Sequence, residues 1–401
     1  MNAVIVGSGV AAIATVRALR SAGYAGSMTM VSEEAEPPYD RPPLSKQYLA
    51  GSLTRSDLRL LRDERADEIG LTTVIGTATR LDTHVNVLTL ADGRAIRYDG
   101  LVIATGAAAR TLPYGEDLAG VHYLRTRRDA DSLRKSLLRG GPLVVVGAGF
   151  IGLEVAATAR VLGLDVTVIE AASAPLTRVL GATGGQVITD IHRSRGVDFR
   201  FDARVTGIVG DSRVTAVEIQ TLAGTATLAA DSVVVGVGAV PRTEWLTGSG
   251  VHVEDGVVCD ARGRTSAADV YAAGDVSRWL NELTGAHVRM EQWQTAIEQG
   301  GIVGDALTAD LGTSDVRPRS WASVPYFWSD QYDHKIQFCG APGAVWESRQ
   351  TERGWVACCA ADETTLSGIL AIDGPVALAR GRRKVAAKAP WREAVAWLEA
   401  L

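Results

Sequence analysis

The sequence predicts an α/β fold with two doubly wound parallel sheets, followed by a smaller C-terminal α+β domain with an antiparallel sheet. Short apolar runs that end at or near glycine are typical of parallel strands covered on both faces. A strand-like run, a Gly-x-Gly turn and a helix-like stretch occur together twice, in "AVIVGSGVAAIATV" (3–16) and "LVVVGAGFIGLEVA" (143–156). Beyond about residue 318 apolar and polar residues mix, which favours a sheet of another kind.

Composition excludes several classes of protein. With 401 residues, 46% hydrophobic and 22% charged, the chain can build two or three domains with large cores. A net charge of −5 gives no general attraction to nucleic acid or to an anionic membrane. We find no apolar run long enough to span a bilayer and no leader pattern after Met1, so we expect a soluble, cytoplasmic protein.

The first two thirds of the chain contain the parallel-strand candidates. The predicted helices between strands are Val10–Ser21 and Phe150–Leu162, each followed by a glycine. A helical crossover between two strands forms a βαβ unit, which requires parallel strands. The predicted strands are Ala3–Val6, Met28–Val31, Leu101–Ala104, Leu143–Val146, Val166–Ile169, Ser232–Gly236 and Val270–Ala273.

The C-terminal part is predicted to hold a small antiparallel sheet with one solvated face, because its strand candidates mix apolar and polar residues between Gly, Pro and Asp. We place its start near Pro318. A helix is predicted over "WREAVAWLEAL" (391–401). The strand candidates are "SVPYFWSD", "HKIQFCG", "AVWESRQ" and "GWVACCA".

The second glycine-rich turn is a complete GxGxxG, formed by Gly147, Gly149 and Gly152. Such a turn lets backbone N–H groups approach a pyrophosphate at a helix N-terminus. Glu170 ends the following strand, "VTVIE", where a carboxylate accepts hydrogen bonds from the adenosine ribose diol and repels a 2′-phosphate. The pattern predicts a dinucleotide site that prefers NADH to NADPH.

The first glycine-rich turn departs from the pattern in two places. Gly7 and Gly9 are present, but Ala12 stands at the third position, which mainly serves packing of the helix on the strand. The strand "MTMVS" ends in Ser32 where an acid is expected, and Glu33 follows it. A second dinucleotide is predicted here, with the ribose contact open between these two residues.

Two dinucleotide sites in one chain fit hydride transfer between a nicotinamide and a flavin, because FAD carries an ADP half like that of NAD. Two further motifs favour FAD at the first site. In "LVIATGAAAR", Thr105 and Gly106 follow a strand and let the backbone pass close to a cofactor. In "DVYAAGDV", Asp275 follows a strand and a glycine, where it could accept hydrogen bonds from the ribityl hydroxyls.

These motifs resemble the flavoprotein reductases with two dinucleotide-binding domains, and specifically the ferredoxin reductases that serve bacterial cytochromes P450 and aromatic-ring dioxygenases. The resemblance runs nearly end to end and is most specific in "PPYDRPPLSKQYL" (37–49), "GAGFIGLEVAA" (147–157), "VYAAGDV" (270–276), "EQWQTAIEQG" (291–300) and "PYFWSDQYDHKIQFCG" (325–340). It implies a glutathione-reductase-like fold with an FAD domain at 1–112 and 236–317, an NADH domain at 113–235 and a C-terminal domain at 318–401.

The resemblance also implies roles for individual residues. Lys46, presented from the first turn of a helix after two prolines, would lie near the flavin and pair with Glu154. An ammonium there would stabilise negative charge on reduced flavin. Trp293, at the start of a helix, and Trp328, from the C-terminal domain, would lie close to the cofactors. Lys46, Glu154 and Trp293 are the predicted catalytic residues.

The motifs and the resemblance together define two sets of cofactor contacts. The FAD set is Gly7, Gly9, Val10, Ala11, Ala12, Ser32, Glu33, Arg41, Pro42, Lys46, Ala104, Thr105, Gly106, Arg110, Gly274, Asp275, Glu291, Gln292, Trp293, Ala296 and Trp328. The NAD set is Gly147, Gly149, Phe150, Ile151, Gly152, Glu154, Glu170, Arg178, Gly236 and Gly238.

The cysteines exclude related activities. Disulfide reductases of this fold carry a CxxC or CxxxxC beside the flavin, and peroxidase relatives carry one cysteine after the second strand, but residues 33–50 contain none. Electrons are therefore expected to leave the flavin without a thiol relay. The cysteines form no metal-ligand spacing and are expected to be small buried hydrophobes; they are Cys259, Cys339, Cys358 and Cys359.

The resulting hypothesis is an enzyme that takes hydride from NADH and passes single electrons to a small acidic [2Fe–2S] ferredoxin, which feeds a cytochrome P450 or Rieske-type oxygenase. We expect a monomer or homodimer. The alternatives are rubredoxin reduction, NADH oxidase or peroxidase activity, and an NADH-sensing flavoprotein like apoptosis-inducing factor. A basic run is the candidate docking surface for an acidic partner: Arg380, Arg382, Arg383, Lys384, Lys388 and Arg392.

Overall fold

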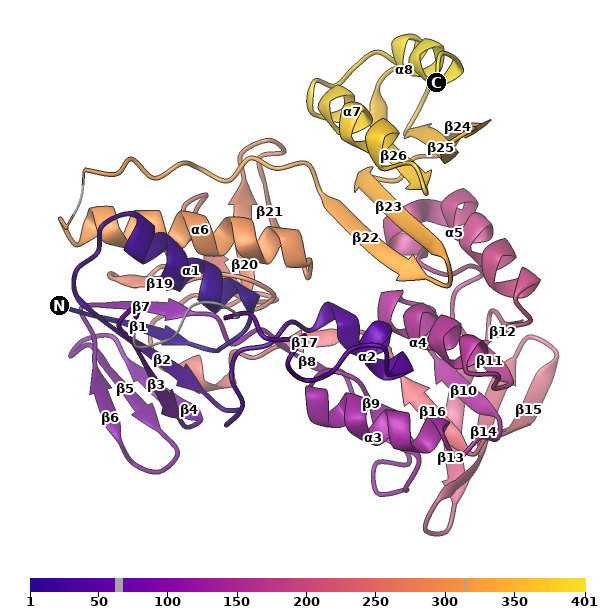
Figure 1. Cartoon of the computed structure of the whole chain (residues 1–401), viewed down its shortest axis with the longest axis horizontal. Coiled ribbons are helices and arrows are strands. Elements are labelled where there is room, and N and C mark those ends of the chain that lie inside the picture. Colours follow the sequence, from indigo (N-terminus) through magenta and orange to yellow (C-terminus); the bar gives the residue numbers. More distant parts are fainter. Residues whose placement is uncertain (62–67, 314) are drawn as a thin grey trace. The chain divides into compact units, whose positions relative to one another are not determined.

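The structure is a computed structural model that describes residues 1–61, 68–313 and 315–401. The chain divides into two compact units, each built from three separate segments (Figure 1). The first unit comprises Met1–Asp40, Arg55–Ala108 and Val240–Ser323, and the second comprises Arg41–Thr54, Ala109–Ala239 and Val324–Leu401. Each unit contains a five-stranded parallel sheet, so the predicted α/β class with two doubly wound sheets is confirmed.

The core of the first unit is a parallel sheet whose strand order is β19-β7-β1-β2-β3. Its central strands are buried because helices cover them, and Ala3, Val4 and Ile5 are fully buried. The strands are β1 (Asn2–Val6), β2 (Ser27–Ser32), β3 (Leu71–Ile75), β7 (Gly100–Ile103) and β19 (Val270–Ala272). Strands β1, β2, β7 and β19 match the predicted strands to within a residue at each end, whereas β3 was not predicted.

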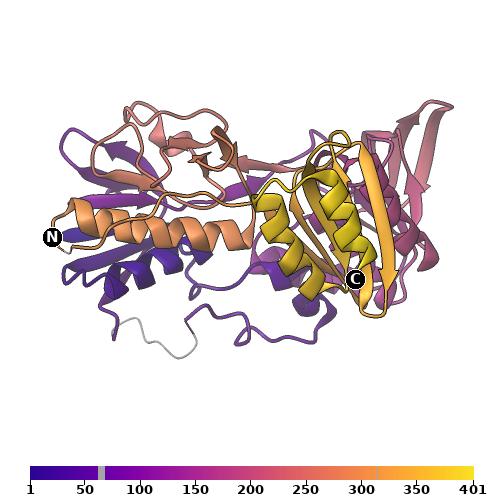
Figure 2. The same cartoon turned by 90° about the horizontal axis from the view of Figure 1, so that it is seen from above.

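Two helices pack side by side in this unit, α1 (Val10–Ser21) and α6 (Trp293–Asp310) (Figure 2). Helix α1 has the bounds that the sequence predicted. Glycines let the two backbones approach closely, because a Cβ on Gly300 would lie 2.4 Å from the carbonyl oxygen of Ala11. A Cβ on Gly304 would lie 2.5 Å from the Cβ of Ala18. This contact places the N-terminal end of α6 beside the first glycine-rich turn.

The second unit has the corresponding sheet, in the order β12-β11-β10-β16-β9 and parallel throughout. Its strands are β9 (Val121–Tyr123), β10 (Leu143–Val146), β11 (Val166–Ile169), β12 (Asp198–Arg200) and β16 (Ser232–Val235). The helices are α3 (Arg127–Leu137), α4 (Phe150–Val161), α5 (Thr177–Ser194), η1 (Pro42–Ser45) and α2 (Gln47–Ala50). Helix α4 follows β10 through the complete GxGxxG, as predicted.

Smaller sheets and one short helix complete the connections between these elements. One ribbon is β8 (Ala107–Ala109) with β17 (Ala239–Pro241), and a short 3-10 helix is η2 (Glu244–Leu246). The three-stranded sheets are β4 (Ala78–Asp82), β5 (Val87–Leu90) and β6 (Ala95–Arg97); β13 (Arg204–Gly210), β14 (Val214–Thr221) and β15 (Gly224–Ala229); and β18 (Val257–Cys259), β20 (Ser277–Asn281) and β21 (Ala286–Arg289).

The C-terminal part forms an antiparallel sheet in the order β22-β23-β26-β25-β24. Four strands coincide with the predicted ones: β22 (Tyr326–Gln331), β23 (His334–Gly340), β24 (Val345–Thr351) and β25 (Gly354–Ala360). Strand β26 (Leu366–Ile372) and helix α7 (Pro375–Ala386) were not predicted from the sequence, whereas α8 (Trp391–Glu399) lies where it was predicted. The run "LSGILAI" lacks polar alternation, because β26 is a central strand.

The expectation that this sheet has one solvated face was wrong. Nearly all residues of β25 and β26 are buried. Helix α7 lies on one face, where a Cβ on Gly381 would meet Ile369 at 2.2 Å. On the other face, the ring of Phe327 lies 4.4 Å from that of Phe150 in α4, measured between centroids. Because helices cover both faces of its central strands, these strands are buried, whereas the edge strand β24 is largely exposed.

None of the helices in the described part of the chain combines the length and apolar character that a membrane crossing requires. The same residues contain no group of three or more His, Cys, Asp or Glu side chains that could hold a metal ion.

Two buried histidines make the second unit sensitive to acid. Burial lowers the pKa of His122 and of His192 to about 4. Between pH 6.5 and 4 the unfolded chain therefore binds protons that the folded chain does not, so stability falls as the pH falls. Each histidine is expected to remove up to about 3 kcal/mol from the free energy of unfolding across this range. Urea unfolding at pH 7 and pH 5 measures the loss.

A His122→Leu variant should lose a smaller part of its stability between these two pH values than the parent. Replacing the exposed His252 by Gln is the control and should leave the loss unchanged. Equal losses in the parent and the His122→Leu variant would contradict the assignment.

Candidate functional site

The glycines of the second unit serve different purposes. Gly147 has φ 96° and a Cβ there would lie 2.4 Å from the carbonyl oxygen of Gly236, so both conformation and packing require glycine. A Cβ on Gly152 would lie 2.2 Å from the carbonyl oxygen of Gly147. These two residues bring helix α4 against strands β10 and β16. They account for the fold of the turn without any ligand.

Gly149, the middle glycine, has no such explanation. It is the N-cap of α4 with φ −79° and ψ −179°, which is extended backbone open to any residue. A Cβ there would meet only the carbonyl oxygen of Gly236, at 3.8 Å. The space that the missing side chain leaves lies at the N-terminus of a helix, where N–H groups favour an anion. A dinucleotide pyrophosphate fits this cradle.

Glu170 is held at the end of β11 by the same turn. Its two carboxylate oxygens accept hydrogen bonds from the backbone N–H of Ala148, at 2.8 Å, and of Ala172, at 2.9 Å. The side chain is half-buried, and a carboxylate has acceptor capacity beyond these two bonds. The structure thus places a fixed acceptor beside the glycine-rich turn, as a ribose diol requires.

The first unit repeats this arrangement. Gly7 has φ 119°, and a Cβ there would lie 2.1 Å from the carbonyl oxygen of Ala104. Gly9 caps α1 in extended conformation (φ −79°, ψ −174°) and a Cβ there would meet no atom within 4 Å. Ala12, at the third position, is fully buried. As at Gly149, no contact within the protein requires glycine at position 9, and the open space at this helix N-terminus fits a pyrophosphate.

Ser32 and Glu33, the two candidates for the ribose contact in this unit, lie in different surroundings. The Ser32 hydroxyl is buried, lies 2.9 Å from that of Ser8 and donates to the carbonyl oxygen of Glu34 at 2.7 Å. Glu33 is exposed and forms an ion pair with Arg242. The carboxylate is thus held at the surface after β2, one residue later than in the second unit.

The start of α6 has the features of a ligand-facing helix end. Gln292 is its N-cap, but no side chain caps the helix. Among the described residues, Gln292 Oε1 is buried without a hydrogen-bond partner. The next residue, Trp293, donates from Nε1 to Asp40 Oδ1 at 2.7 Å, which fixes its ring. An unpartnered acceptor beside exposed helix N–H groups fits a bound heterocycle with both donor and acceptor edges.

Lys46 and Glu154 form the expected ion pair in the second unit, with Nζ 2.9 Å from Oε1. Both side chains are buried, at 10% and 7% exposed. The expectation that Lys46 belongs to the first turn of a helix was wrong. It lies between η1 and α2 with φ −122° and ψ −111°, because the chain ends the proline-led 3-10 turn before the helix begins. That break directs the ammonium toward α4.

Glu154 has two further partners that were not predicted from the sequence. Ser45 Oγ donates to Oε2, and Ser329 Oγ donates to Oε1 at 2.6 Å. The carboxylate therefore receives an ammonium and two hydroxyls from two segments of the chain, residues 45–46 and β22. The available signal was the alternation of β22, in which Phe327 and Ser329 share the buried face. A polar residue at an inward position indicates a buried partner.

Trp328 lies on the opposite face of β22 and is half-buried. Its ring stacks on that of Tyr326, with centroids 6.2 Å apart and 23° between the planes. The Arg382 guanidinium of α7 lies 5.3 Å from the Tyr326 ring centroid. A cation and two aromatic rings thus form a continuous column between α7 and Trp328.

Other predicted site residues have structural contacts of their own. Thr105 Oγ1 donates to the carbonyl oxygen of Arg242 at 2.9 Å, and Arg41 donates to that of Arg125 at 2.8 Å. Arg110 and Arg178 are exposed.

The predicted set is divided between the two units. The first unit holds Gly7, Gly9, Val10, Ala11, Ala12, Ser32, Glu33, Ala104, Thr105, Gly106, Gly274, Asp275, Glu291, Gln292, Trp293 and Ala296. The second holds the whole NAD set together with Arg41, Pro42, Lys46, Arg110 and Trp328.

The cysteines are buried, as expected. Burial raises the pKa of the Cys359 thiol to about 11 and those of Cys339 and Cys358 to about 12, and it also raises that of Cys259. A raised pKa keeps each of these thiols protonated at neutral pH, and the thiolate is the reactive form, so these cysteines are not expected to take part in redox chemistry.

A family model described as pyridine nucleotide-disulphide oxidoreductase matches residues 1–300, and one described as reductase C-terminal matches residues 326–397. Rhodocoxin reductase of Rhodococcus erythropolis is 41% identical over 85% of this chain and 78% of its own length. A ferredoxin–NAD(P)(+) reductase of Sphingomonas is 38% identical over 84% of this chain and 81% of its own.

Two further matches concern the electron acceptor. A rubredoxin–NAD(+) reductase of Pseudomonas putida is 36% identical over 85% of this chain and 87% of its own length. The solved structure of the covalent putidaredoxin reductase–putidaredoxin complex matches with a TM-score of 0.89 and 29% identity, covering 100% of this chain and 99% of the other.

Proposed function

The chain belongs to the pyridine nucleotide-disulphide oxidoreductase family and, within it, to the ferredoxin reductases, and from this premise we propose that it passes electrons from NADH through a bound FAD to a ferredoxin. Membership confirms the resemblance drawn from the sequence motifs. The observation that carries the proposal is the open space at Gly9 and at Gly149, each the N-cap of a helix that follows a parallel strand, where no contact within the protein requires glycine. Two cradles in one chain fit two dinucleotides.

The first unit is proposed to hold FAD and the second NADH. The first has the unpartnered Gln292 Oε1 and the uncapped helix α6, which suit a flavin ring. The second has Glu170 fixed beside its turn, which suits the unphosphorylated ribose of NADH. The corresponding domains would be 1–112 with 236–317 for FAD, 113–235 for NADH and 318–401 at the C-terminus.

A bound flavin supplies the ability to accept a hydride and to release electrons one at a time. The protein contributes binding and orientation, which can account for most of the acceleration of a hydride transfer. Lys46 is proposed to favour the reduced form of the flavin through the positive charge of its ammonium, with Glu154 holding the ammonium in place. Trp293, fixed by Asp40, is proposed to limit the space beside the ring.

The test is a visible spectrum of the purified protein. Flavin bands are expected, bleached by one equivalent of NADH and restored by oxidised [2Fe–2S] ferredoxin under anaerobic conditions. A colourless protein that cannot be reconstituted with FAD would contradict the proposal. Rapid reoxidation without a change in oligomeric state would also exclude an NADH-sensing role of the kind found in apoptosis-inducing factor.

Rubredoxin reduction is the second candidate, favoured by the similarity to a rubredoxin–NAD(+) reductase. Comparing turnover with the two acceptors at equal concentration separates the two functions. Oxidase or peroxidase activity is disfavoured, because the cysteines are buried and their thiol pKa values are raised. The buried free thiols also fit the reducing cytoplasm proposed as the site of action.

Replacing Glu170 by Ala is expected to weaken NADH binding about tenfold, through the loss of the ribose hydrogen bonds, and to narrow the preference over NADPH. Steady-state kinetics with both coenzymes measure the ratio. Asp198→Ala, which removes a nearby exposed acid, is the control and should leave the ratio unchanged. An unaltered preference in the Glu170 variant would show that this carboxylate does not distinguish the coenzymes.

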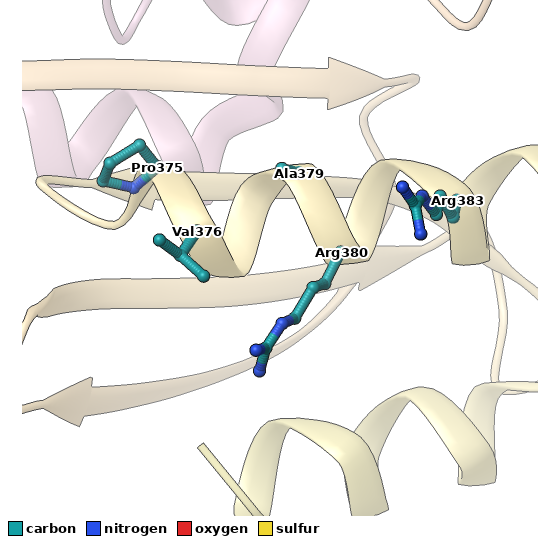
Figure 3. Close-up of a pocket in the computed structure, with 5 residues that line it drawn as sticks. All are labelled: Pro375, Val376, Ala379, Arg380 and Arg383. Carbon is teal, nitrogen blue, oxygen red and sulfur yellow. The ribbon is translucent and has the colours of Figure 1, made fainter.

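The basic residues of the C-terminal part that belong to α7 lie on different sides of this helix. Arg380 and Arg383 are exposed and lie, with Val376, along one surface of the helix (Figure 3). Arg382 is turned toward the Tyr326 ring of β22 and donates to the carbonyl oxygen of Val324, just before that strand, at 3.2 Å. Lys384 pairs with a glutamate of α8. We therefore propose that Arg380 and Arg383 meet an acidic ferredoxin.

The double variant Arg380→Glu/Arg383→Glu is expected to raise the KM for ferredoxin about tenfold at low ionic strength and to weaken its salt dependence. NADH-dependent reduction of ferricyanide, which needs no docking, should be unchanged. Arg353→Glu, an exposed reversal elsewhere in the C-terminal part, is the matched control. An unchanged KM and salt dependence would place docking elsewhere.

A further inference from the structure

A line of hydrogen bonds continues from Glu154 into the core of the second unit. Gln331 Nε2 donates to Ser329 Oγ at 3.0 Å, and Gln331 Oε1 lies 2.8 Å from His192 Nε2. The other ring nitrogen, His192 Nδ1, lies 3.0 Å from the hydroxyl of Tyr332. We call these four residues the positioning chain: Tyr332, His192, Gln331 and Ser329.

The positioning chain has a single donor direction. Gln331 Oε1 can only accept, so His192 Nε2 carries the ring proton. Burial lowers the pKa of His192 to about 4, so the ring is neutral at pH 7 and Nδ1 is an acceptor. The Tyr332 hydroxyl then donates to Nδ1. Each donor in the positioning chain therefore points toward Glu154.

The donor direction of each hydrogen bond determines the donor direction of the next one. With its oxygen held by His192, the Gln331 amide must turn its NH₂ group toward Ser329. With a donor on its oxygen, the Ser329 hydroxyl must turn its hydrogen toward the carboxylate. An amide does not pass protons on as a hydroxyl does, so the arrangement orients groups rather than conducting protons.

Burial makes this arrangement rigid. His192 and Ser329 are fully buried, and Gln331 is 1% exposed. The edge of the His192 ring also faces Phe199, with centroids 6.0 Å apart. No water is needed to complete the line from Tyr332 to Glu154, because each successive pair is within hydrogen-bond distance.

We propose that the positioning chain holds the carboxylate of Glu154, and through it the ammonium of Lys46, in a single orientation. Its members are positioning residues, because none of them contacts the ammonium directly. The inference rests on the proposed function for its effect on catalysis, since Lys46 matters there only as a partner of the flavin. The hydrogen bonds of the positioning chain do not depend on that function.

The first test needs no cofactor. In the protein with ¹⁵N-labelled histidine, the resonances of His192 are those absent from a His192→Asn variant, among six histidines in the sequence. At pH 7 they should show a protonated Nε2 and an unprotonated, hydrogen-bonded Nδ1. A ring protonated at Nδ1, or at both nitrogens, would overturn the donor order.

The second test measures the flavin midpoint potential in Gln331→Met and Ser329→Ala variants. Loss of orientation should lower the equilibrium constant for flavin reduction about tenfold, which is about 30 mV for a two-electron couple. Gln337→Met is the matched control, because Gln337 is a buried amide on the neighbouring strand that bonds to Tyr326 instead. Its potential should equal that of the parent.

Lys46→Met separates the inference from the proposed function. If this variant shifts the potential but Gln331→Met and Ser329→Ala do not, the positioning role is wrong and the function stands. If Lys46→Met itself leaves the potential of bound FAD unchanged, the proposed role of Lys46 is wrong. In a Lys46→Met background the Ser329→Ala change should have no further effect, and an additive shift would contradict action through Lys46.

Discussion

Replacing Lys46 by Met is expected to lower the free energy of unfolding by about 3 kcal/mol, the lower part of the range measured when one partner of a buried ion pair is removed. The substitution leaves the Glu154 carboxylate buried without its cation. Ser45 and Ser329 still donate to it, which is why the loss should not be larger. Urea unfolding of the protein at pH 7 measures the change.

The control for this variant is Lys384→Met, which removes the cation of an ion pair in the same unit whose side chains are 25% and 59% exposed. Surface pairs contribute little, so its effect should stay below about 1 kcal/mol. Adding Glu154→Gln to Lys46→Met should restore most of the lost stability, because no buried charge then remains. Equal effects of the two Lys→Met changes would show that the Lys46 pair is not a buried one.

Replacing Gly149 by Ala is expected to leave the fold and its stability unchanged while weakening NADH binding about 100-fold. The backbone there is extended, and a Cβ would meet only one atom, at 3.8 Å, so nothing in the protein opposes the methyl group. The methyl would instead occupy the position of the pyrophosphate and remove about two charge-assisted hydrogen bonds, or roughly 3 kcal/mol. Titration calorimetry with NADH and thermal unfolding provide the two measurements.

A matched control is Gly301→Ala, because Gly301 is likewise a residue whose added Cβ would meet nothing within 4 Å, but in the middle of α6. It should bind NADH as the parent does. By contrast, Gly152→Ala should destabilise the protein, since its methyl would lie 2.2 Å from a backbone oxygen. If Gly149→Ala binds NADH with the affinity of the parent, the cradle at Gly149 is not the pyrophosphate site.

Local patterns predicted the elements that each glycine-rich turn connects. Helix α1 begins at Val10 and ends at Ser21 as the sequence indicated, because its glycine N-cap, its apolar periodicity and the glycine after it are all local signals. Seven of the parallel strands were predicted for a similar reason, since burial on both faces leaves a continuous apolar run. The edge strands β3, β9 and β12 were missed, because they are partly exposed and carry no such run. Errors of one residue arose at strand ends, where pairing decides the boundary.

The C-terminal part was harder to predict because its burial comes from segments distant in the chain. Strand β26 reads as an apolar run without alternation, and its place between β23 and β25 depends on partners that no local pattern reveals. The basic run suggested a uniformly charged face, yet Arg382 folds back onto Tyr326 while Arg380 stays exposed. Successive residues of a helix project in different directions around its axis, and tertiary packing decides which of them contact the sheet.

By itself the sequence determined that two parallel strands are each followed by a glycine-rich turn and a helix, and it predicted a dinucleotide at each turn, because glycine spacing, strand pattern and the acidic strand end are short-range features. It also indicated the family and hence the pairing of Lys46 with Glu154. Only the tertiary structure decided what holds that pair: Ser45, Ser329 and His192 come from segments more than a hundred residues apart. Buried polar groups need hydrogen-bond partners, and the fold supplies these partners from segments that are distant in the sequence. No local sequence pattern therefore predicts which residues will pair.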